Sequence, residues 1–204
     1  ISNPATPLRV GFYATPGGAK VVVVAGNYAY VAATDTMRVI DITNPAQPSE
    51  VGSYKAPDVI TDIDVSGGYA YVIAGGLRII NVTDPTKPTE SGFVVSPLGD
   101  YHHVDVSGNY AYVAALGRFV VVNVANPAAP NEIGVYDPSG QMEDVSVAGN
   151  YAYVSDYDQG LLIINITNPA APSEVSFYHV HWAVSVYFSG NYAYLANELS
   201  SLLV

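Results

Sequence analysis

The chain of 204 residues contains no cysteine and few basic residues. Without cysteine, disulfide crosslinks and thiol chemistry are excluded. Seven Lys and Arg residues against 18 Asp and Glu residues give a formal net charge of −11, which repels phosphate backbones and anionic lipid surfaces. The sequence also lacks any apolar run long enough for a membrane-spanning helix. We therefore expect neither nucleic-acid binding nor membrane insertion.

Charge is scarce overall, since only 12% of residues are charged and 50% are hydrophobic. This composition predicts a folded chain with a large buried core. The sequence starts at Ile1 without an initiator Met, which we interpret as a sign of a processed or excised product.

A tyrosine doublet recurs five times, each 41 residues after the last, starting at Tyr28, Tyr69, Tyr110, Tyr151 and Tyr192. A unit of this length cannot bury its apolar residues alone, so the units must stack into one continuous core. Repeats near this length with short strands are typical of propellers. We predict an all-β, five-bladed β-propeller that occupies residues 1–204 as a single domain.

Each unit reads as a four-stranded antiparallel blade. A Gly-Asn or Gly-Gly pair separates the first two strands, where a tight hairpin needs positive φ. The third strand is apolar almost throughout, as expected for a strand covered on both faces. An Asx-Pro turn then leads to a fourth strand at the outer edge.

The two ends of the chain supply different parts of a unit. Residues 1–13 align with residues 42–54 and so contain only a fourth strand, whereas the C-terminal residues supply strands one to three. We therefore predict that the fifth blade is closed by the N-terminal strand together with three C-terminal strands. A trimmed longer array is the alternative.

The segments "LRIINVTDP", "LLIINITNP" and "MRVIDITNP", with "EVGSY" and "SGNYAYVA", closely resemble the LVIVD-repeat family over the whole chain. The resemblance implies a β-propeller of a secreted or surface-exposed bacterial or archaeal protein, commonly without an assigned enzymatic activity. It supplies no catalytic residues. The fifth unit departs from the pattern because it lacks the third proline and the glycine after it, so we expect an irregularity near His179–Trp182.

The innermost strands of a propeller face a central channel, and alignment of the units places Asp62, His103 and Asp144 in one ring. Two carboxylates and an imidazole are adequate ligands for a divalent cation. The alternative is a solvated channel whose polar walls hold water. Paired carboxylates also suit a glycoside hydrolase, with Glu143, Asp144, Asp62 and Asp105 as candidates.

The units differ most at residues 97–103, 139–144 and 178–184, which contain all four histidines and the single tryptophan. Trp182 and Tyr101 are suited to stacking on a sugar ring. The candidate ligand-binding residues at this mouth are Tyr101, His102, His103, Glu143, His179, His181 and Trp182. The alternative is that these aromatic and imidazole rings are buried core residues at the entrance of the channel.

Asn81 and Asn165 each begin an Asn-X-Thr glycosylation sequon. Asp41 and Asn123 hold the same position in other units, so turn chemistry explains these residues equally well.

The sequence thus favours a non-enzymatic extracellular or cell-surface propeller of a prokaryote, acting as an adhesion, interaction or assembly module. Its partners would be other surface proteins or copies of itself. No cofactor is expected beyond a possible divalent cation. A carbohydrate-binding propeller and a glycoside hydrolase are the alternatives.

Overall fold

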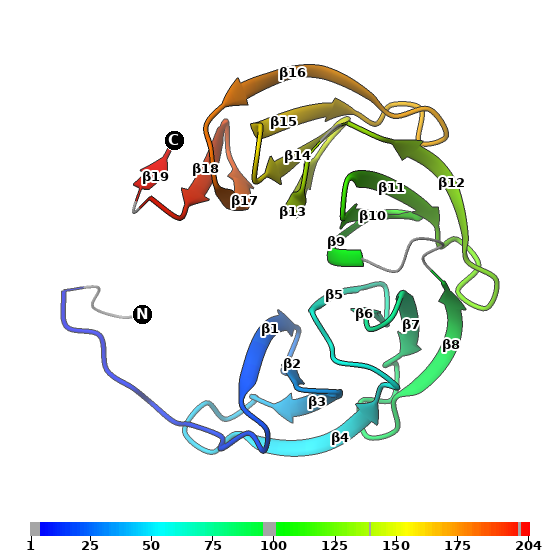
Figure 1. Cartoon of the computed structure of the whole chain (residues 1–204). Coiled ribbons are helices and arrows are strands. Elements are labelled where there is room, and N and C mark those ends of the chain that lie inside the picture. The colour runs from blue at the N-terminus through cyan, green and yellow to red at the C-terminus, as the bar shows by residue number, and fades with distance from the viewer. Residues whose placement is uncertain (1–4, 96–100, 139, 200) are drawn as a thin grey trace.

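The structure, a computed structural model, describes residues 5–95, 101–138, 140–199 and 201–204. These residues form five antiparallel sheets arranged as blades around a central axis, without a helix (Figure 1). The prediction of an all-β, five-bladed propeller is confirmed. No helix in the described part of the chain is long and apolar enough to cross a membrane.

Within each blade, consecutive strands pair in chain order, with the first strand innermost. Blade one contains β1 (Ala19–Ala25), β2 (Tyr28–Ala33), β3 (Thr36–Asp41) and β4 (Ser49–Lys55). Blade two contains β5 (Asp62–Ser66), β6 (Tyr69–Ile73), β7 (Leu77–Asn81) and β8 (Thr89–Val94). Blade three contains β9 (Tyr101–Ser107), β10 (Tyr110–Ala115), β11 (Arg118–Asn123) and β12 (Asn131–Tyr136). Blade four contains β13 (Met142–Ala148), β14 (Tyr151–Asp156), β15 (Gly160–Asn165) and β16 (Ser173–His179). Blade five contains β17 (Ala183–Ser189), β18 (Tyr192–Asn197) and β19 (Ser201–Leu203).

The hairpins between first and second strands follow the predicted glycine chemistry. Gly26 has φ of 58°. Ala25 and Tyr28 are the last paired residues of β1 and β2, so Gly26 and Asn27 form a two-residue loop between these strands. In blade two both Gly67 and Gly68 have positive φ, at 59° and 83°. These values lie in the left-handed region that glycine reaches without steric cost.

Consecutive blades pack face to face: one face of a blade contacts the blade that follows it in the chain, and the other face contacts the blade before it, where the structure describes one. We call these the forward face and the backward face. The forward face of blade one, with Tyr30, Met37 and Val39, packs against the backward face of blade two, which includes Ile63 and Val72. Similar clusters join blades two and three, three and four, and four and five. The propeller core therefore lies between the blades.

Burial of the tyrosine doublets depends on the presence of a following blade. Tyr30, Tyr71 and Tyr112 are 4–5% exposed, as the core interpretation requires. Tyr194, the equivalent residue of the last blade, is only half-buried.

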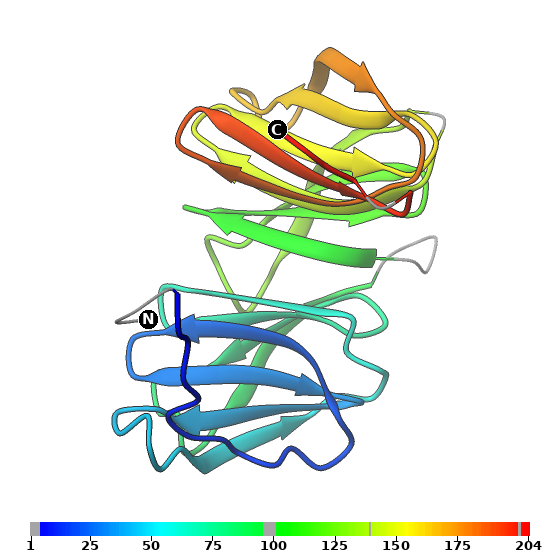
Figure 2. The same ribbon diagram turned by 90° about the vertical axis from the view of Figure 1, so that its left-hand side faces the viewer.

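The fifth sheet differs from the prediction because it contains three strands, and the N-terminal segment, residues 5–15, forms no strand. This segment and β19 lie on opposite sides of an open sector of the ring (Figures 1 and 2). The physical reason lies in its contacts with blade one. Tyr13 packs against a cluster of Ala29, Val31 and Ile40, and its hydroxyl donates to Glu50 at 2.5 Å. Residues 1–4 of the predicted strand lie outside the described residues.

Candidate functional site

The five inner strands β1, β5, β9, β13 and β17 line a central cavity of about 500 Å³. Its wall is apolar in blade one, where Val21 and Val23 face it, and polar in the blades that follow. This is the channel that the alignment of units predicted.

His103 lies between two carboxylates of neighbouring blades. Its Nδ1 is 3.5 Å from Asp62 Oδ2 and 3.5 Å from Asp144 Oδ1. Burial by itself would lower the pKa of His103, but the hydrogen bond and charge of Asp62, with the charges of Asp144 and Glu143, outweigh burial and raise that pKa. The ring thus carries a histidine whose protonated form is stabilised by its neighbours.

The channel carboxylates accept hydrogen bonds from backbone N–H groups of the next blade. Val104 N donates to Asp62 Oδ2 at 2.8 Å, and Val106 N donates to Asp64 Oδ2 at 2.8 Å. The same bond joins Val147 N to Asp105 at 2.6 Å, Val186 N to Asp144 at 3.0 Å and Phe188 N to the Ser146 hydroxyl at 3.2 Å. We refer to these as the inter-blade hydrogen bonds. They satisfy amide donors on the unpaired edges of the inner strands β9, β13 and β17.

Partial burial has an electrostatic consequence for these acids. Desolvation raises the pKa of Asp105 to about 6, against the lowering effect of the Val147 N–H, and the nearby Asp64 raises it further. Desolvation likewise raises the pKa of Asp64, although two backbone N–H groups oppose the shift.

The structure brings Asp62, His103 and Asp144 together, as the alignment of the units predicts. Among the residues that the structure describes, no group of three or more His, Asp or Glu side chains is placed to hold a metal ion. Asp62 and Asp144 each accept a backbone N–H group of the next blade, and Ser185 donates its hydroxyl hydrogen to Asp144 at 2.7 Å.

Only some of the predicted ligand-binding residues at the channel entrance lie together in the structure. His179 and His181 pack edge to face with ring centroids 4.7 Å apart, and the ring of Trp182 lies 6.1 Å from that of His181. Trp182 is 38% exposed and has φ of 62°, which is rare outside glycine. This strained residue is the irregularity expected in the fifth unit.

Two backbone hydrogen bonds hold Trp182 in that conformation. Its N–H donates to Tyr157 O at 2.6 Å, and its carbonyl accepts from Glu198 N at 3.0 Å. The hydroxyl of Tyr157 donates to the Glu198 carboxylate at 2.9 Å. The exposed indole is thus positioned by blades four and five together.

Tyr101 does not belong to this cluster, which corrects the prediction that it stacks with Trp182 on a sugar. It is 4% exposed, it packs in the core between blades two and three, and its hydroxyl donates to Glu132. Tyr101 is the first residue of β9, and the alternation of that strand turns its ring inward. His102 and Glu143 are half-buried on inner strands. Residues 97–100 and 139 of the predicted mouth lie outside the described residues.

Asn81 and Asn165 have the structural roles that turn chemistry predicts. Asn81 Oδ1 accepts from Thr83 N at 2.9 Å, and Asn165 Oδ1 accepts from Thr167 N at 2.8 Å. Asp41 makes the same bond to Thr43 N at 2.8 Å. Each side chain closes an Asx turn.

Sequence reasoning missed two sets of contacts between blades. The first is the acceptor function of Asp64 and Ser146, because their partners are backbone amides 42 residues away. The second is a tyrosine that donates to a glutamate of the next blade, from the N-terminal segment, β4 and β12: Tyr13 to Glu50, Tyr54 to Glu90 and Tyr136 to Glu174. Both sets of contacts can be recognised by comparing the residues at equivalent positions of the five units.

The LVIVD repeat matches residues 16–56, 60–95, 98–138, 139–180 and 182–204. Among proteins with curated descriptions, none matches this sequence significantly.

Solved structures show the same fold at low identity. A functionally unknown protein from Desulfotomaculum acetoxidans DSM 771 is 12% identical with a TM-score of 0.78, over 91% of this chain and 65% of that one. A protein from Lactobacillus plantarum is 15% identical with a TM-score of 0.73, over 85% and 62%. The periplasmic gluconolactonase of Pseudomonas aeruginosa is 17% identical with a TM-score of 0.72, over 86% and 61%. The chain thus spans less than two thirds of each of these structures.

Proposed function

Because the chain belongs to the LVIVD-repeat family, we propose that it is a non-enzymatic interaction and assembly module exposed at a prokaryotic cell surface. The observation that carries this proposal is the apolar forward face of blade five, which none of the described residues covers. On blade one, Met37 and Val39 are 0% exposed beneath the following blade. Leu202 and Val204 hold the equivalent positions in blade five and are 67% and 73% exposed.

Exposed apolar side chains gathered on one face are typical of protein interaction sites. Tyr187, at 66%, and Tyr192, at 60%, lie on the same face. Aromatic residues of this kind supply much of the binding energy of protein interfaces. The face therefore suits a protein partner better than a small molecule.

The channel supports the non-enzymatic part of the proposal. Three of the four candidate acids for a hydrolase, Asp62, Asp105 and Asp144, accept backbone N–H groups of the next blade. A carboxylate held in this way stabilises the contact between blades, and it is poorly placed to exchange protons with a substrate.

Sedimentation velocity over a wide range of protein concentration tests the proposal. We expect self-association that Leu202→Asp weakens, because the substitution places a charge in an apolar interface. Leu116→Asp is the matched control, since Leu116 is 47% exposed on the turn between β10 and β11, away from blade five. Turnover of a glycan that Asp144→Asn abolishes without loss of binding would instead identify a hydrolase.

The surface location follows from the family resemblance and has its own test. Protease treatment of intact cells that carry an epitope-tagged chain should remove the tag signal. Retention of the signal until the cells are lysed contradicts an exposed location.

Carbohydrate binding is the second candidate function, and the strained, exposed Trp182 favours it. Backbone strain of this kind is retained where the surrounding structure enforces it, often at binding sites. The flat indole and the neighbouring His179 and His181 can stack on and hydrogen-bond a sugar. A glycan array should then show binding that Trp182→Ala abolishes, and an array without any retained glycan contradicts this candidate.

A further inference from the structure

The end of the second strand holds a polar residue in only two of the five described blades, and these are the blades that the segment of Trp182 connects. In blade four this residue is Asp156, and in blade five it is Asn197. The equivalent positions of the other blades hold buried alanines, which are 0–3% exposed: Ala33, Ala74 and Ala115. Since alanine suffices for the packing of a blade, the two polar residues require a separate explanation.

Asp156 is 0% exposed and fixes the turn that follows it, residues 157–159, which we call the Asp156 turn. Its Oδ1 accepts the N–H groups of Asp158 at 2.9 Å and Gln159 at 2.7 Å. Its Oδ2 has no well-aligned donor among the residues that the structure describes. Burial raises the pKa of Asp156, as does the charge of Asp158, although nearby backbone N–H groups oppose the shift. A buried carboxyl with one unpaired oxygen destabilises the fold, so its presence favours a role for the turn that it fixes.

The Asp156 turn holds the segment of Trp182 from the side of blade four. Tyr157 O accepts the N–H of Trp182 at 2.6 Å, and Asp158 O lies 3.1 Å from Nδ1 of His181. These two carbonyl groups bind consecutive residues of the segment, so displacement of the turn would release both.

Asn197 holds the same segment from the side of blade five. Its Nδ2 donates to the carbonyl of His181 at 2.9 Å, and its Oδ1 accepts the N–H of Leu199 at 2.9 Å. Glu198 N donates to the carbonyl of Trp182 at 3.0 Å. Trp182, with φ of 62°, is therefore held by groups of both blades.

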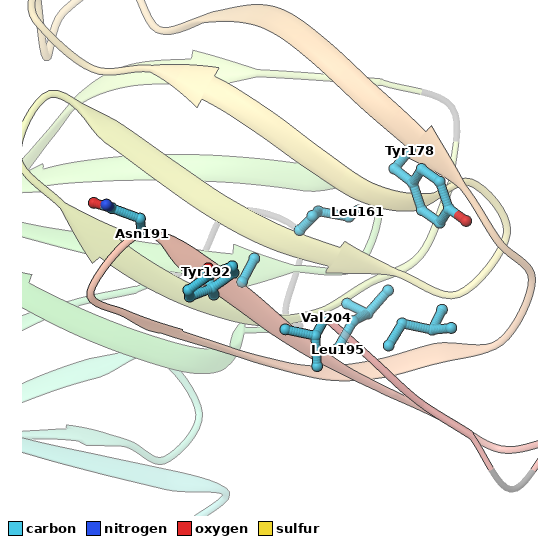
Figure 3. Close-up of a pocket in the computed structure, with 8 residues that line it drawn as sticks. Leu161, Tyr178, Asn191, Tyr192, Leu195 and Val204 are labelled. Atoms are coloured by element: carbon cyan, nitrogen blue, oxygen red, sulfur yellow. The ribbon is translucent and has the colours of Figure 1, made fainter.

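Apolar residues anchor the segment at both ends. Val180 and Ala183 pack in the joint between blades four and five. The same cluster contains Leu161 of β15 and Leu195 of β18, both drawn in Figure 3. Trp182 and the residue before it are exposed and lie between these two fixed points of the core.

We propose that Asp156 and Asn197 are positioning residues, which hold Trp182 in its positive-φ conformation so that the indole is ordered before a ligand binds. This inference rests on the second candidate function, carbohydrate binding, and explains how that site is preorganised. A residue other than glycine keeps such a conformation only where its surroundings enforce it. A side chain that is ordered in advance loses less conformational entropy on binding. All of the contacts that carry the inference lie within blades four and five.

Three carboxylates lie around Tyr157, whose carbonyl binds the N–H of Trp182. The Tyr157 hydroxyl donates to Glu198, and this bond raises the pKa of Tyr157. The charges of Glu198, Glu143 and Asp158 raise it further. These carboxylates repel the negative charge of an acidic sugar, so the ligand class that suits the site is a neutral sugar.

Trp182 is the single tryptophan of the 204 residues, so its fluorescence tests the positioning role directly. Asp156→Ala gives blade four the residue that blades one to three have at this position, and the variant should therefore fold. We expect its emission to shift to longer wavelength and its anisotropy to fall, because the indole gains freedom when the turn loses its acceptor. Asn197→Ala should have the same effect. Asp156→Asn retains an oxygen acceptor and should restore the emission and anisotropy of the wild type.

Ser155→Ala is the matched control. Ser155 precedes Asp156 in β14, it is also 0% exposed, and its hydroxyl has no hydrogen-bond partner in the described part of the chain. This variant should keep the emission of the wild type. Unchanged emission in both Asp156→Ala and Asn197→Ala would overturn the inference, as would an equal shift in Ser155→Ala or a failure of Asp156→Asn to restore the signal. Should Asp156→Ala not fold, Asn197→Ala decides alone, because Asn197 is only half-buried.

A glycan array separates the positioning role from the ligand. The wild type should retain neutral glycans and none that ends in an acidic sugar. Asp156→Ala should weaken this binding by up to about tenfold, because ordering a free side chain on binding costs about that much. Equal binding by the wild type and Asp156→Ala would overturn the inference, and retention of acidic glycans alone would contradict the ligand class. An array without any retained glycan, together with the expected change in Trp182 fluorescence, would contradict the second candidate function while the positioning role stands.

Discussion

At the scale of single residues, the channel acids act mainly on the backbone of the following blade. A carboxylate such as Asp64 or Asp105 lies on one inner strand and accepts an amide N–H from the next. A buried N–H without a partner costs about 1–3 kcal/mol. The polar ring that the sequence presents as a candidate site is therefore largely a set of bonds between blades.

The raised pKa of Asp105 predicts how the stability of the protein changes with pH. Its folded-state pKa of about 6 lies above the ordinary value of 3.8, so its ionisation destabilises the folded state as pH rises from about 4 to 6. Asp105→Asn retains an acceptor for Val147 N and cannot ionise. We expect its free energy of unfolding at pH 7 to be higher than that of the wild type by on the order of 1 kcal/mol, with no difference near pH 4.

Urea denaturation at both pH values measures this difference. Asp105→Ala is the control, because it removes the acceptor as well as the charge and should destabilise the protein at either pH. A lower stability of Asp105→Asn at pH 7 would show that the charge itself stabilises the blade contact.

For His103, the protonated form, not the neutral form, stabilises the folded state. Because its folded-state pKa is raised, it contributes stability that is fully present below the unfolded pKa of about 6.5 and is lost as pH rises through the folded value. His103→Gln should flatten the pH dependence of the unfolding midpoint between about pH 6 and 8. His102→Gln, at the adjacent position of β9, should leave that dependence in place. Equal slopes for wild type and His103→Gln would exclude the ion cluster as their source.

At the scale of strands, the outer strands β4, β8 and β12 each approach the next blade closely at one glycine. Gly52 of β4 approaches the Pro85 carbonyl so closely that a Cβ would collide with it. Gly52→Ala should therefore lower the free energy of unfolding by roughly 1–3 kcal/mol through displacement of β4. The matched substitution is Ser176→Ala in β16, where a side chain is already present and exposed. Thermal unfolding of both variants checks the difference, and a tolerated Gly52→Ala would mean that the outer strand is loosely held.

Most elements were predictable because each depends on residues close in sequence. The glycine at Gly26 fixes a hairpin, and the doublets at Tyr30 and Tyr71 alternate as a strand buried on both faces. Tyr101 was misplaced because the sequence does not mark where β9 begins, and the first position of that strand faces the core. The inter-blade hydrogen bonds escaped prediction because the backbone amides that donate them are common to every residue type.

At the scale of the whole molecule, the open ring is the feature that the sequence did not predict. The phase of the repeat matches the N-terminal segment to blade five, but ring closure depends on the angle between blades. That angle comes from the packing of side chains such as Phe119 and Leu162 across each joint. No single position of the repeat determines the angle between blades.

Uneven burial along the arc predicts uneven opening. The cluster between blades four and five has three fully buried members, Ala183, Val186 and Leu195, whereas the clusters around blades two and three are larger. Hydrogen exchange should therefore be faster in β17–β19 than in β6 and β10, because local stability follows buried apolar contacts. Raising the protein concentration should slow exchange in β18 and β19 if blade five becomes covered. Uniform exchange over all blades would contradict this order.

The inter-blade hydrogen bonds all run in one direction, from an amide of the later blade to a side chain of the earlier one. Translation proceeds in the same direction, so blades three, four and five each reach a neighbour whose acceptors are already in place. Folding on the ribosome can thus proceed by successive addition, with each completed sheet serving as the template for the next.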